Sequence, residues 1–258
     1  MRALILFVCV GFLSNAQAQV DRSVQPQPGP APEINFGTPK EHQFKSGLTL
    51  MVVENHKLPQ VSVSLSIDNP LAVEGEKAGL SRLLSSMMGK GSKNIPKDDF
   101  DEEVDFMGAR LGLSSQGGYA SALKRYFPRV FEMMADAALH PHFLEEEFQK
   151  EVDKTLEGLK SSEKDVKTAA RRVENLLSYG KDHPYGEYVS EESVKRVSID
   201  DLHQLYHKNF HAQNAYITIV GDIDFETAKK LTKKYFGKWA KGQVAPSDKT
   251  SLSKRHHH

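Results

Sequence analysis

Cysteine is nearly absent from this sequence of 258 residues, in which Cys9 is the only one. A folded region without cysteine cannot be held together by disulfides, so its stability must come from a hydrophobic core. The roughly 215 residues that follow the N-terminal segments are enough to supply such a core. An excess of either charge is also lacking, because 34 basic side chains face 34 acidic ones. This balance gives no electrostatic reason to expect nucleic acid or an anionic membrane surface as a partner.

Long apolar runs are missing as well. The most hydrophobic stretch, Ala3 to Leu13, is shorter than the twenty or so residues that a membrane span requires. With Arg2 before it and Ala16-Gln17-Ala18 after it, this stretch has the three parts of a secretory signal. The sequence therefore predicts export to the periplasm or the extracellular space. Removal of Arg2 with the signal leaves 33 basic against 34 acidic side chains, a net charge of about −1.

The chain is expected to have four parts. Residues 1–18 are the signal peptide, and residues 19–32 form a linker that contains the proline-rich run Gln25 to Pro32. The folded domain is expected over residues 33–245, and residues 246–258 form a polar tail that ends in three histidines.

Within the domain, paired strand patterns are followed by consecutive helical patterns, which favours the α+β class: an antiparallel sheet with helices packed on one face. Strands are predicted over 48–53, 61–67, 109–115, 119–123 and 215–220. Helices are predicted over 76–88, 97–107, 127–138, 144–162, 165–179, 199–208 and 225–238. Two of these helices have recognisable starts, after Pro96 and after Ser198, each followed by early acidic residues.

The run from Ala78 to Met88 is the most informative stretch. Its apolar residues recur at i, i+3, i+4, i+7 and i+8, the core-facing stripe of an amphipathic helix. At about 100° per residue, Arg82, Ser85 and Ser86 then cluster on the opposite face. Taken alone, this pattern indicates a buried stripe with a solvated back.

The longer run "EKAGLSRLLSSMMGKGSKNIP" resembles the active-site segment of the insulinase and pitrilysin family of zinc peptidases, which reads like "AGLAHFLEHMLFKGTxxxP". Further similar segments follow in family order and extend the resemblance over about Glu33 to Lys241. They are Gly108-Ala109 before a strand, His140-Pro141-His142-Phe143, the run Glu147 to Glu151, His183-Pro184-Tyr185-Gly186, and Val220-Gly221-Asp222. The ordered set, more than any one segment, identifies the chain as a member of the family's N-terminal half.

In active relatives, the inverted motif H-x-x-E-H supplies two zinc ligands and a general base. The resemblance places Arg82, Ser85 and Ser86 at these positions. Arginine has no lone pair to offer and repels a cation, and serine is neither a carboxylate base nor a strong ligand. The family's third ligand, a glutamate on a later helix, falls at Gly158, with Glu157 one residue away, while the supporting acid remains as Glu151. Since catalytic zinc needs three protein ligands, the resemblance implies a chain without zinc or peptidase activity.

An alternative metal site remains open at His203, His207 and His211, which are spaced i, i+4, i+8. In the family these residues fall in a packing segment, so ordinary structural roles are favoured for them. The same applies to His140 and His142, as surface residues, and to His183, as a loop anchor.

The resemblance also implies partners. Family members are built from two related halves and bind substrate as an added strand at a sheet edge. Here that edge corresponds to Leu111, Gly112, Leu113, Ser114 and Ser115. The expected function is a non-catalytic subunit that supports an active peptidase, paired with a second insulinase-type half or with an active subunit. A stand-alone exported peptide-binding or scaffold protein is the alternative, and a metallopeptidase with relocated ligands is a third.

Overall fold

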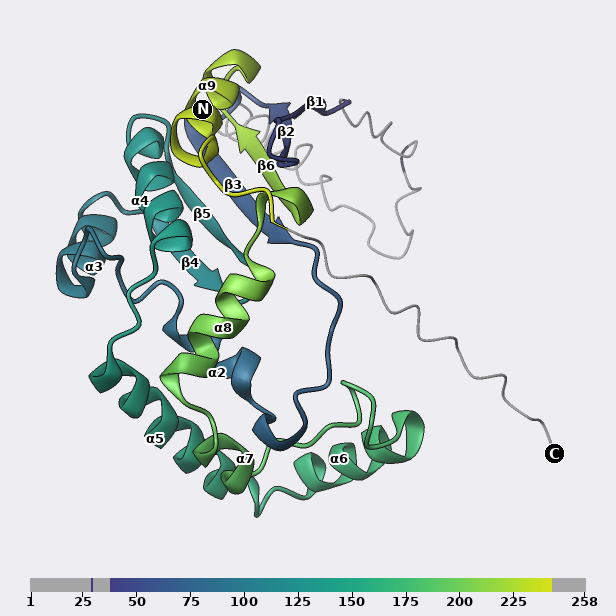
Figure 1. The fold of residues 1–258 in the computed structure, drawn as a ribbon. Coiled ribbons are helices and arrows are strands. Elements are labelled where there is room, and N and C mark those ends of the chain that lie inside the picture. The colour runs from purple at the N-terminus through teal and green to yellow at the C-terminus, as the bar shows by residue number, and fades with distance from the viewer. Residues whose placement is uncertain (1–28, 30–37, 243–258) are drawn as a thin grey trace, which may run out of the picture. The chain divides into compact units, whose positions relative to one another are not determined.

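A computed structural model describes Gly29 and residues 38–242, and the expected signal peptide, most of the linker and the polar tail lie outside these residues. The described part forms one six-stranded sheet with helices (Figure 1). The strands are β1 (Lys40–Gln43), β2 (Thr49–Glu54), β3 (Gln60–Ile67), β4 (Arg110–Ser114), β5 (Gly117–Leu123) and β6 (Ala215–Gly221). The α-helices are α2 (Leu80–Met87), α3 (Lys97–Phe106), α4 (Phe127–Leu139), α5 (Glu145–Ser162), α6 (Val166–Tyr179), α7 (Glu191–Lys195), α8 (Ile199–Asn209) and α9 (Phe225–Phe236). Two short 3₁₀ helices are η1 (Gly75–Lys77) and η2 (Ala212–Asn214).

The sheet has the strand order β1-β2-β6-β3-β5-β4. Four of its pairs are antiparallel, as predicted, but β2 and β6 run parallel, with Leu50 beside Ile217 and Val52 beside Ile219. The α+β class is confirmed, and the sheet is mixed where the sequence predicted a purely antiparallel one. β4 is an edge strand, hydrogen-bonded only to β5 among the described strands.

The sheet has one buried face and one open face. Along β3, Val61, Val63 and Leu65 are buried, whereas the serines between them are partly exposed. This period-2 pattern places one set of side chains under the helices and the other toward solvent. Helices α4 and α9 pack on the sheet and on each other, and Phe127, Phe131 and Phe236 are fully buried between these layers.

The remaining helices position the expected site. In Figure 1, α2, α5, α6 and α7 lie beyond one end of the sheet, and α8 runs from there back toward β6. α2 packs against β4, α5 and α8. None of the described helices has the length and apolarity to cross a membrane.

The predicted helix over 76–88 is interrupted. A 3₁₀ turn ends at Lys77, and α2 begins only at Leu80, because Gly79 adopts a left-handed φ of 106°. Both predicted helix starts are confirmed: α3 begins after Pro96, and Ser198 and Asp201 form a reciprocal capping box at α8. β1 and α7 were not predicted, since both are very short.

Candidate functional site

The start of α2 is held by a carboxylate from outside the helix. Glu74 accepts hydrogen bonds from the backbone N–H groups of Gly79 (2.7 Å) and Ser81 (2.8 Å). Its own N–H donates to Glu187, which therefore anchors the loop before the helix. Negative charge at a helix N-terminus satisfies free N–H groups and complements the helix dipole. These contacts fix the position of α2 and of the face that carries Arg82, Ser85 and Ser86.

The predicted faces of α2 are confirmed. Leu83, Leu84 and Met87 are buried, whereas Arg82 is exposed and Ser86 is half-buried. Arg82 makes no ion pair with any described residue. The face opposite the core therefore presents a fixed positive charge and hydroxyl groups.

Ser85 ties α2 to the β4–β5 turn. Its hydroxyl donates to the carbonyl of Ser81 (2.8 Å) and lies 2.8 Å from the Ser115 hydroxyl. The backbone N–H of Ser115 donates to the same oxygen at 3.1 Å. Every hydrogen-bonding position of the Ser85 hydroxyl is therefore used in holding the structure together.

The carboxylate of Glu151 has a cationic partner. Glu151 lies on α5 and is only 8% exposed, and Lys90 Nζ donates to its Oε1 at 2.9 Å. Glu147 lies at 4.0 Å from the same ammonium. Lys90 belongs to the chain that leaves α2, so this pair joins α2 to α5. A buried acid paired in this way leaves no unmatched negative charge to attract a metal ion.

The other predicted positions on α5 face away from any partner. Gly158 and Glu157 are exposed, and a Cβ added at Gly158 would meet no atom within 4 Å. Across residues 38–242, no three histidine, cysteine, aspartate or glutamate side chains come close enough together to hold a metal ion. The residues present therefore do not fit the zinc site of active relatives, which needs three ligands.

The predicted peptide-binding segment lies mostly on the edge strand. Leu111, Gly112, Leu113 and Ser114 belong to β4, with Gly112 exposed and the other three partly exposed. Since β4 pairs with β5 on one side only, the backbone groups of its other side are available to an added strand. Ser115 departs from the prediction, because it lies in the turn after the strand, is buried and bonds to Ser85.

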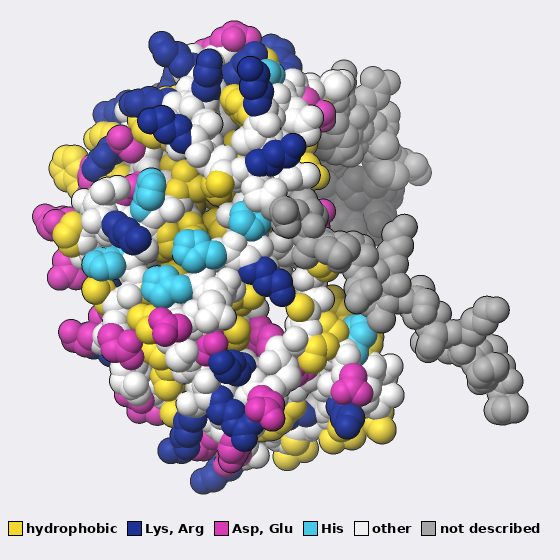
Figure 2. Space-filling view, viewed as in Figure 1, with side chains coloured by type: hydrophobic (Ala, Val, Ile, Leu, Met, Phe, Trp, Pro, Cys, Tyr) yellow, Lys and Arg dark blue, Asp and Glu magenta, His cyan; other side chains and the backbone are white. Residues whose placement is uncertain are grey.

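The three spaced histidines of α8 and its exit do not assemble a metal site. His203 packs on Phe143 at 5.0 Å between ring centroids, while His207 and His211 line a cavity of about 420 Å³ together with Tyr206. Figure 2 shows several histidine side chains gathered across the middle of this face of the molecule. The absence of a three-ligand group among the described residues removes the support for relocated ligands.

His183 has the anchoring role expected of it. Its ring stacks on Tyr179 at 5.1 Å, and its Nδ1 accepts the backbone N–H of Tyr185 at 3.1 Å. Gly186 completes the turn, since a Cβ there would lie 1.9 Å from the Gly180 carbonyl oxygen. The His-Pro-Tyr-Gly run is thus a structural turn that follows α6.

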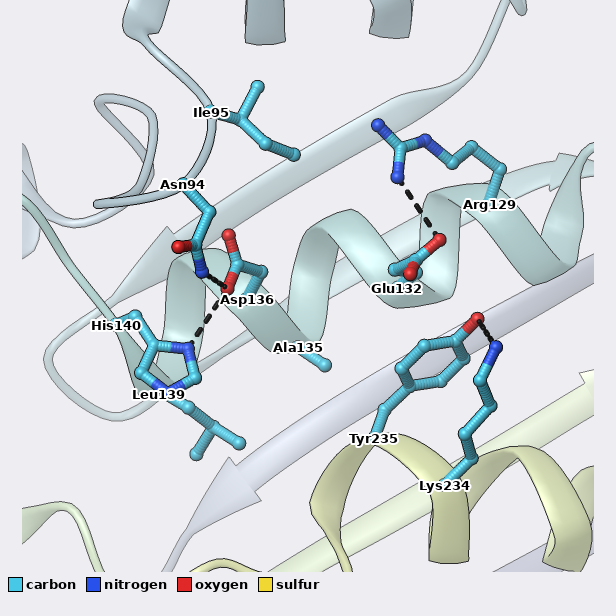
Figure 3. A pocket seen from close by; sticks show the side chains of 10 residues that line it. All are labelled: Asn94, Ile95, Arg129, Glu132, Ala135, Asp136, Leu139, His140, Lys234 and Tyr235. Carbon is cyan, nitrogen blue, oxygen red and sulfur yellow. Dashed lines mark hydrogen bonds and ion pairs between the residues drawn. The ribbon is translucent and has the colours of Figure 1, made fainter.

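A cavity of about 430 Å³ lies on the outer side of α4 and α9, and its polar side chains hold the fold together (Figure 3). Asp136 accepts hydrogen bonds from Asn94 (2.6 Å) and His140 (2.9 Å), and Ser92 also bonds to it. These bonds fasten the loop after α2 to α4. The polar groups that line this cavity are already paired, and none of the predicted site residues lies in it.

Two residues of the site were not predicted from the sequence. Glu74 and Lys90 position α2 from either end, through bonds to Ser81 and to Glu151. Lys90 had a visible signal, because a lysine occupies the matching place in the family pattern. Glu74 had none, since a carboxylate six residues before the first residue of a helix has no characteristic spacing.

Two family models match this chain. The model described as Insulinase (Peptidase family M16) matches residues 50–187, more than half of the chain. The chain belongs to the insulinase family. A second model, described as Peptidase M16 inactive domain, matches residues 196–257.

Its curated relatives in the family are peptidases and subunits of larger complexes. An uncharacterized zinc protease of Rickettsia bellii is 24% identical over 223 residues, which cover 81% of this chain and 52% of that protein. Cytochrome b-c1 complex subunit 1 of Bos taurus is 24% identical over 75% of this chain and 42% of its own length. The beta subunit of the mitochondrial-processing peptidase of Mus musculus is 24% identical over 80% of this chain and 44% of its own. The chain thus spans about half the length of these relatives.

Solved structures share the fold. A peptidase M16 inactive domain from Pseudomonas fluorescens superposes with a TM-score of 0.71 at 19% identity, covering 81% of this chain and 52% of that one. The first half of the periplasmic protease PqqL from Escherichia coli gives a TM-score of 0.66 at 22% identity, covering 81% and 47%. The insulinase-family chain has the fold of one peptidase half.

Proposed function

We propose that this chain is a non-catalytic member of the insulinase family that binds extended peptide segments and supports a peptidase partner. The observation that carries the proposal is the set of side chains at the motif positions of α2. The residue at the general-base position, Ser85, is engaged by Ser115, and the two zinc-ligand positions hold Arg82 and Ser86. None of these side chains can bind zinc strongly or take a proton from water near neutral pH.

The charge on α2 supports the same conclusion. Arg82 puts a fixed positive charge where the family pattern has a histidine, whereas the Lys90–Glu151 pair at 2.9 Å joins residue types that the family pattern also has. A divalent cation placed there would meet the charge of Lys90 and, on the α2 face, that of Arg82. The scaffold of the active site is retained, and its charges now stabilise the packing of α2 on α5.

The open edge of β4 supports peptide binding. A peptide added as a strand gains affinity from backbone hydrogen bonds, which do not require the metal. Gly112, at the middle of this edge, has open space where a side chain would be, so an incoming backbone can approach closely.

We also propose export and a partner. The apolar run after Arg2 and the small residues before the Pro-rich segment have the form of a signal peptide, which favours the periplasmic or extracellular space. The partner in this proposal is a second insulinase-type half or an active peptidase subunit, since one relative of this chain is a subunit of a processing peptidase.

Metal content and peptide turnover, measured on the purified full chain, test this function. We expect much less than one zinc per chain by plasma mass spectrometry, and no cleavage of a fluorescein-labelled unstructured peptide with or without a chelator. The same peptide should bind, as followed by fluorescence anisotropy. Leu111→Pro should weaken binding by about tenfold, since the ring removes an N–H from the free side of β4, whereas Leu111→Ala should bind nearly normally.

Chelator-sensitive cleavage of the peptide by the unmodified chain would contradict the non-catalytic assignment. Equal binding by the Leu111→Pro and Leu111→Ala variants, with both folded by circular dichroism, would show that the peptide does not bind at the free edge of β4. A chain that binds peptide and never joins a peptidase would fit the alternative of a stand-alone peptide-binding protein.

A further inference from the structure

Helix α6 exposes its apolar face to solvent. Its apolar residues Val166, Ala169, Ala170, Val173, Leu176 and Leu177 recur at the spacing of one helical face. Val166 is 80% exposed, Val173 56%, Leu176 47% and Leu177 81%, and no residue of α6 is buried. The residues that are partly covered by the chain are instead polar: Thr168, Arg172 and Asn175. An amphipathic helix that turns its polar side inward has its apolar side free for another surface.

The position of α6 does not depend on burying this stripe. Asp165 accepts the backbone N–H groups of Lys167 and Thr168, and Gly180 follows the last turn with a left-handed φ of 81°. Arg172 donates to the Tyr188 hydroxyl at 2.9 Å and lies over its ring at 4.3 Å. The helix is held by its caps, by the contacts of Arg172 and by the stacking of Tyr179 on His183, and none of these contacts involves the exposed stripe.

The stripe is suited to another helix. From Val166 to Leu177 it extends about 16 Å, and the two alanines near its middle permit close approach. It contains no aromatic side chain, and its flanks carry both signs of charge, including Glu174 and Lys167. A helix that lies on an anionic membrane typically has a strongly basic flank and aromatic anchors. Figure 2 shows hydrophobic side chains at the surface in the area where α6 lies in Figure 1.

Two charges on the flank, Lys167 and Glu174, are complementary to their own reversed copy, whereas Arg171 between them faces Arg171 of the copy near the two-fold axis. Lys167 and Glu174 are seven residues apart and therefore lie on the same side of the stripe. Both are exposed, and neither makes an ion pair with any other residue of the described chain. If a second α6 runs antiparallel about a two-fold axis between Arg171 and Arg172, Val166 meets Leu177 of the copy and Ala170 meets Val173.

In that arrangement the same flanks face each other. Glu174 of the copy comes within about 3 Å of Lys167 along the helix axis, and the reciprocal pair forms on the other side of the two-fold. A single register of the two antiparallel α6 helices thus forms both the apolar contacts and the ion pairs.

We propose that this chain forms a homodimer in which α6 packs antiparallel on α6 of a second copy, through the Val166–Leu177 stripe and two Lys167–Glu174 ion pairs. A helix pair alone is smaller than a standard interface of about 800 Å² per partner, so association in the micromolar range is expected. The pairing is independent of zinc or peptide, because none of its residues lies on α2, β4 or α5.

Sedimentation equilibrium of the full chain tests the dimer. At about 100 µM the chain should have twice its monomer mass, and Leu177→Glu should raise the dimer Kd by about a hundredfold, because it places a charge in the apolar contact. Circular dichroism checks that the helix content is unchanged. Since Leu177 is exposed in the monomer, this substitution should not impair folding.

A charge exchange tests the register. Lys167→Glu and Glu174→Lys should each raise the dimer Kd by about tenfold, and the double variant should return to the value of the unmodified chain. A chain that stays monomeric at 100 µM would overturn the proposal, as would a double variant no better than the single ones. Sedimentation of the monomer with phosphatidylserine vesicles, abolished by Leu177→Glu, would assign the stripe to a membrane and overturn it as well.

Discussion

Under the proposed function, Ser85 occupies a former catalytic position, and its hydroxyl has a structural role. In active relatives a carboxylate at this position must be free to receive a proton, and it cannot also be committed to holding the fold together. Here the hydroxyl of Ser85 bonds to its own helix and to Ser115, which is 8% exposed. A short side chain suits this role, because Ser115 comes within 2.8 Å of it.

Replacement of Ser85 by alanine should destabilise the fold. The Ser115 N–H and hydroxyl would lose a partner in a buried turn, which costs about 1–2 kcal/mol. Urea unfolding measures this change in the free energy of unfolding. Ser86→Ala is the matched control, because Ser86 is also half-buried on α2 and makes no side-chain hydrogen bond within residues 38–242. Equal losses for the two variants would mean that the Ser85–Ser115 contact contributes nothing of its own.

At this scale the sequence identifies candidate site residues and not the contacts that they make. The family resemblance assigns Arg82, Ser85, Ser86 and Gly158 to the former zinc site, and this assignment stays a prediction. The bonds from Ser85 to Ser115 and from Lys90 to Glu151 join positions 30 and 61 residues apart, and no local pattern specifies such distances. Tertiary packing decides them.

Among the elements, α3 and α4 are joined by a two-pronged ion pair. Arg129 on α4 donates from Nε (2.6 Å) and Nη2 (2.8 Å) to the two carboxylate oxygens of Glu103 on α3. These hydrogen bonds from Arg129 lower the pKa of the Glu103 carboxyl below its usual value. Because α3 buries only Phe100 in the core, this pair is a main attachment of the helix.

The pH dependence of this attachment has a definite sign. A carboxyl whose pKa is lower in the folded state stabilises it above the unfolded pKa, near 4.3, and stops doing so as the pH falls through the folded pKa. Glu103→Gln should therefore lower the free energy of unfolding at pH 7 by no more than about 1 kcal/mol, since both side chains are partly exposed. The difference from the unmodified chain should shrink below about pH 4. Glu102→Gln, an exposed neighbour, should show neither effect, and a difference that persisted into acid would contradict the ion-pair account.

Element ends were predictable where one residue decides them and not where several do. Ser198 and Pro96 mark their helices by local chemistry, and both starts are found where expected. The run from Glu76 to Lys77 reads as helix, but Gly79 and the carboxylate of Glu74 start α2 later. The helix propensity of these residues favours one continuous helix. The contact of Glu74 with Glu187 fixes the loop before α2, and two short elements, η1 and α2, form instead.

For the whole molecule, the sheet has one face that packs against helices and one face that is open to solvent. The parallel pairing of β2 with β6 was invisible to the sequence, because alternation of apolar residues is the same in both strand directions. The two faces, however, follow directly from that alternation. The open face carries Tyr119, Leu123, Tyr216 and Val220, all at least 40% exposed, and borders the edge strand β4.

Adjacent residues on β6 allow a direct test of this two-faced architecture. Ile217 is fully buried and Tyr216 is 40% exposed, although they are neighbours on a central strand. Ile217→Ala should cost about 2–5 kcal/mol of unfolding free energy through the cavity it leaves, whereas Tyr216→Ala should cost less than about 1 kcal/mol. Both values come from chemical denaturation of the full chain. A loss at Tyr216 as large as that at Ile217 would mean that the open face is packed within the protein itself, and this face would then be unable to serve a peptide or a second peptidase half.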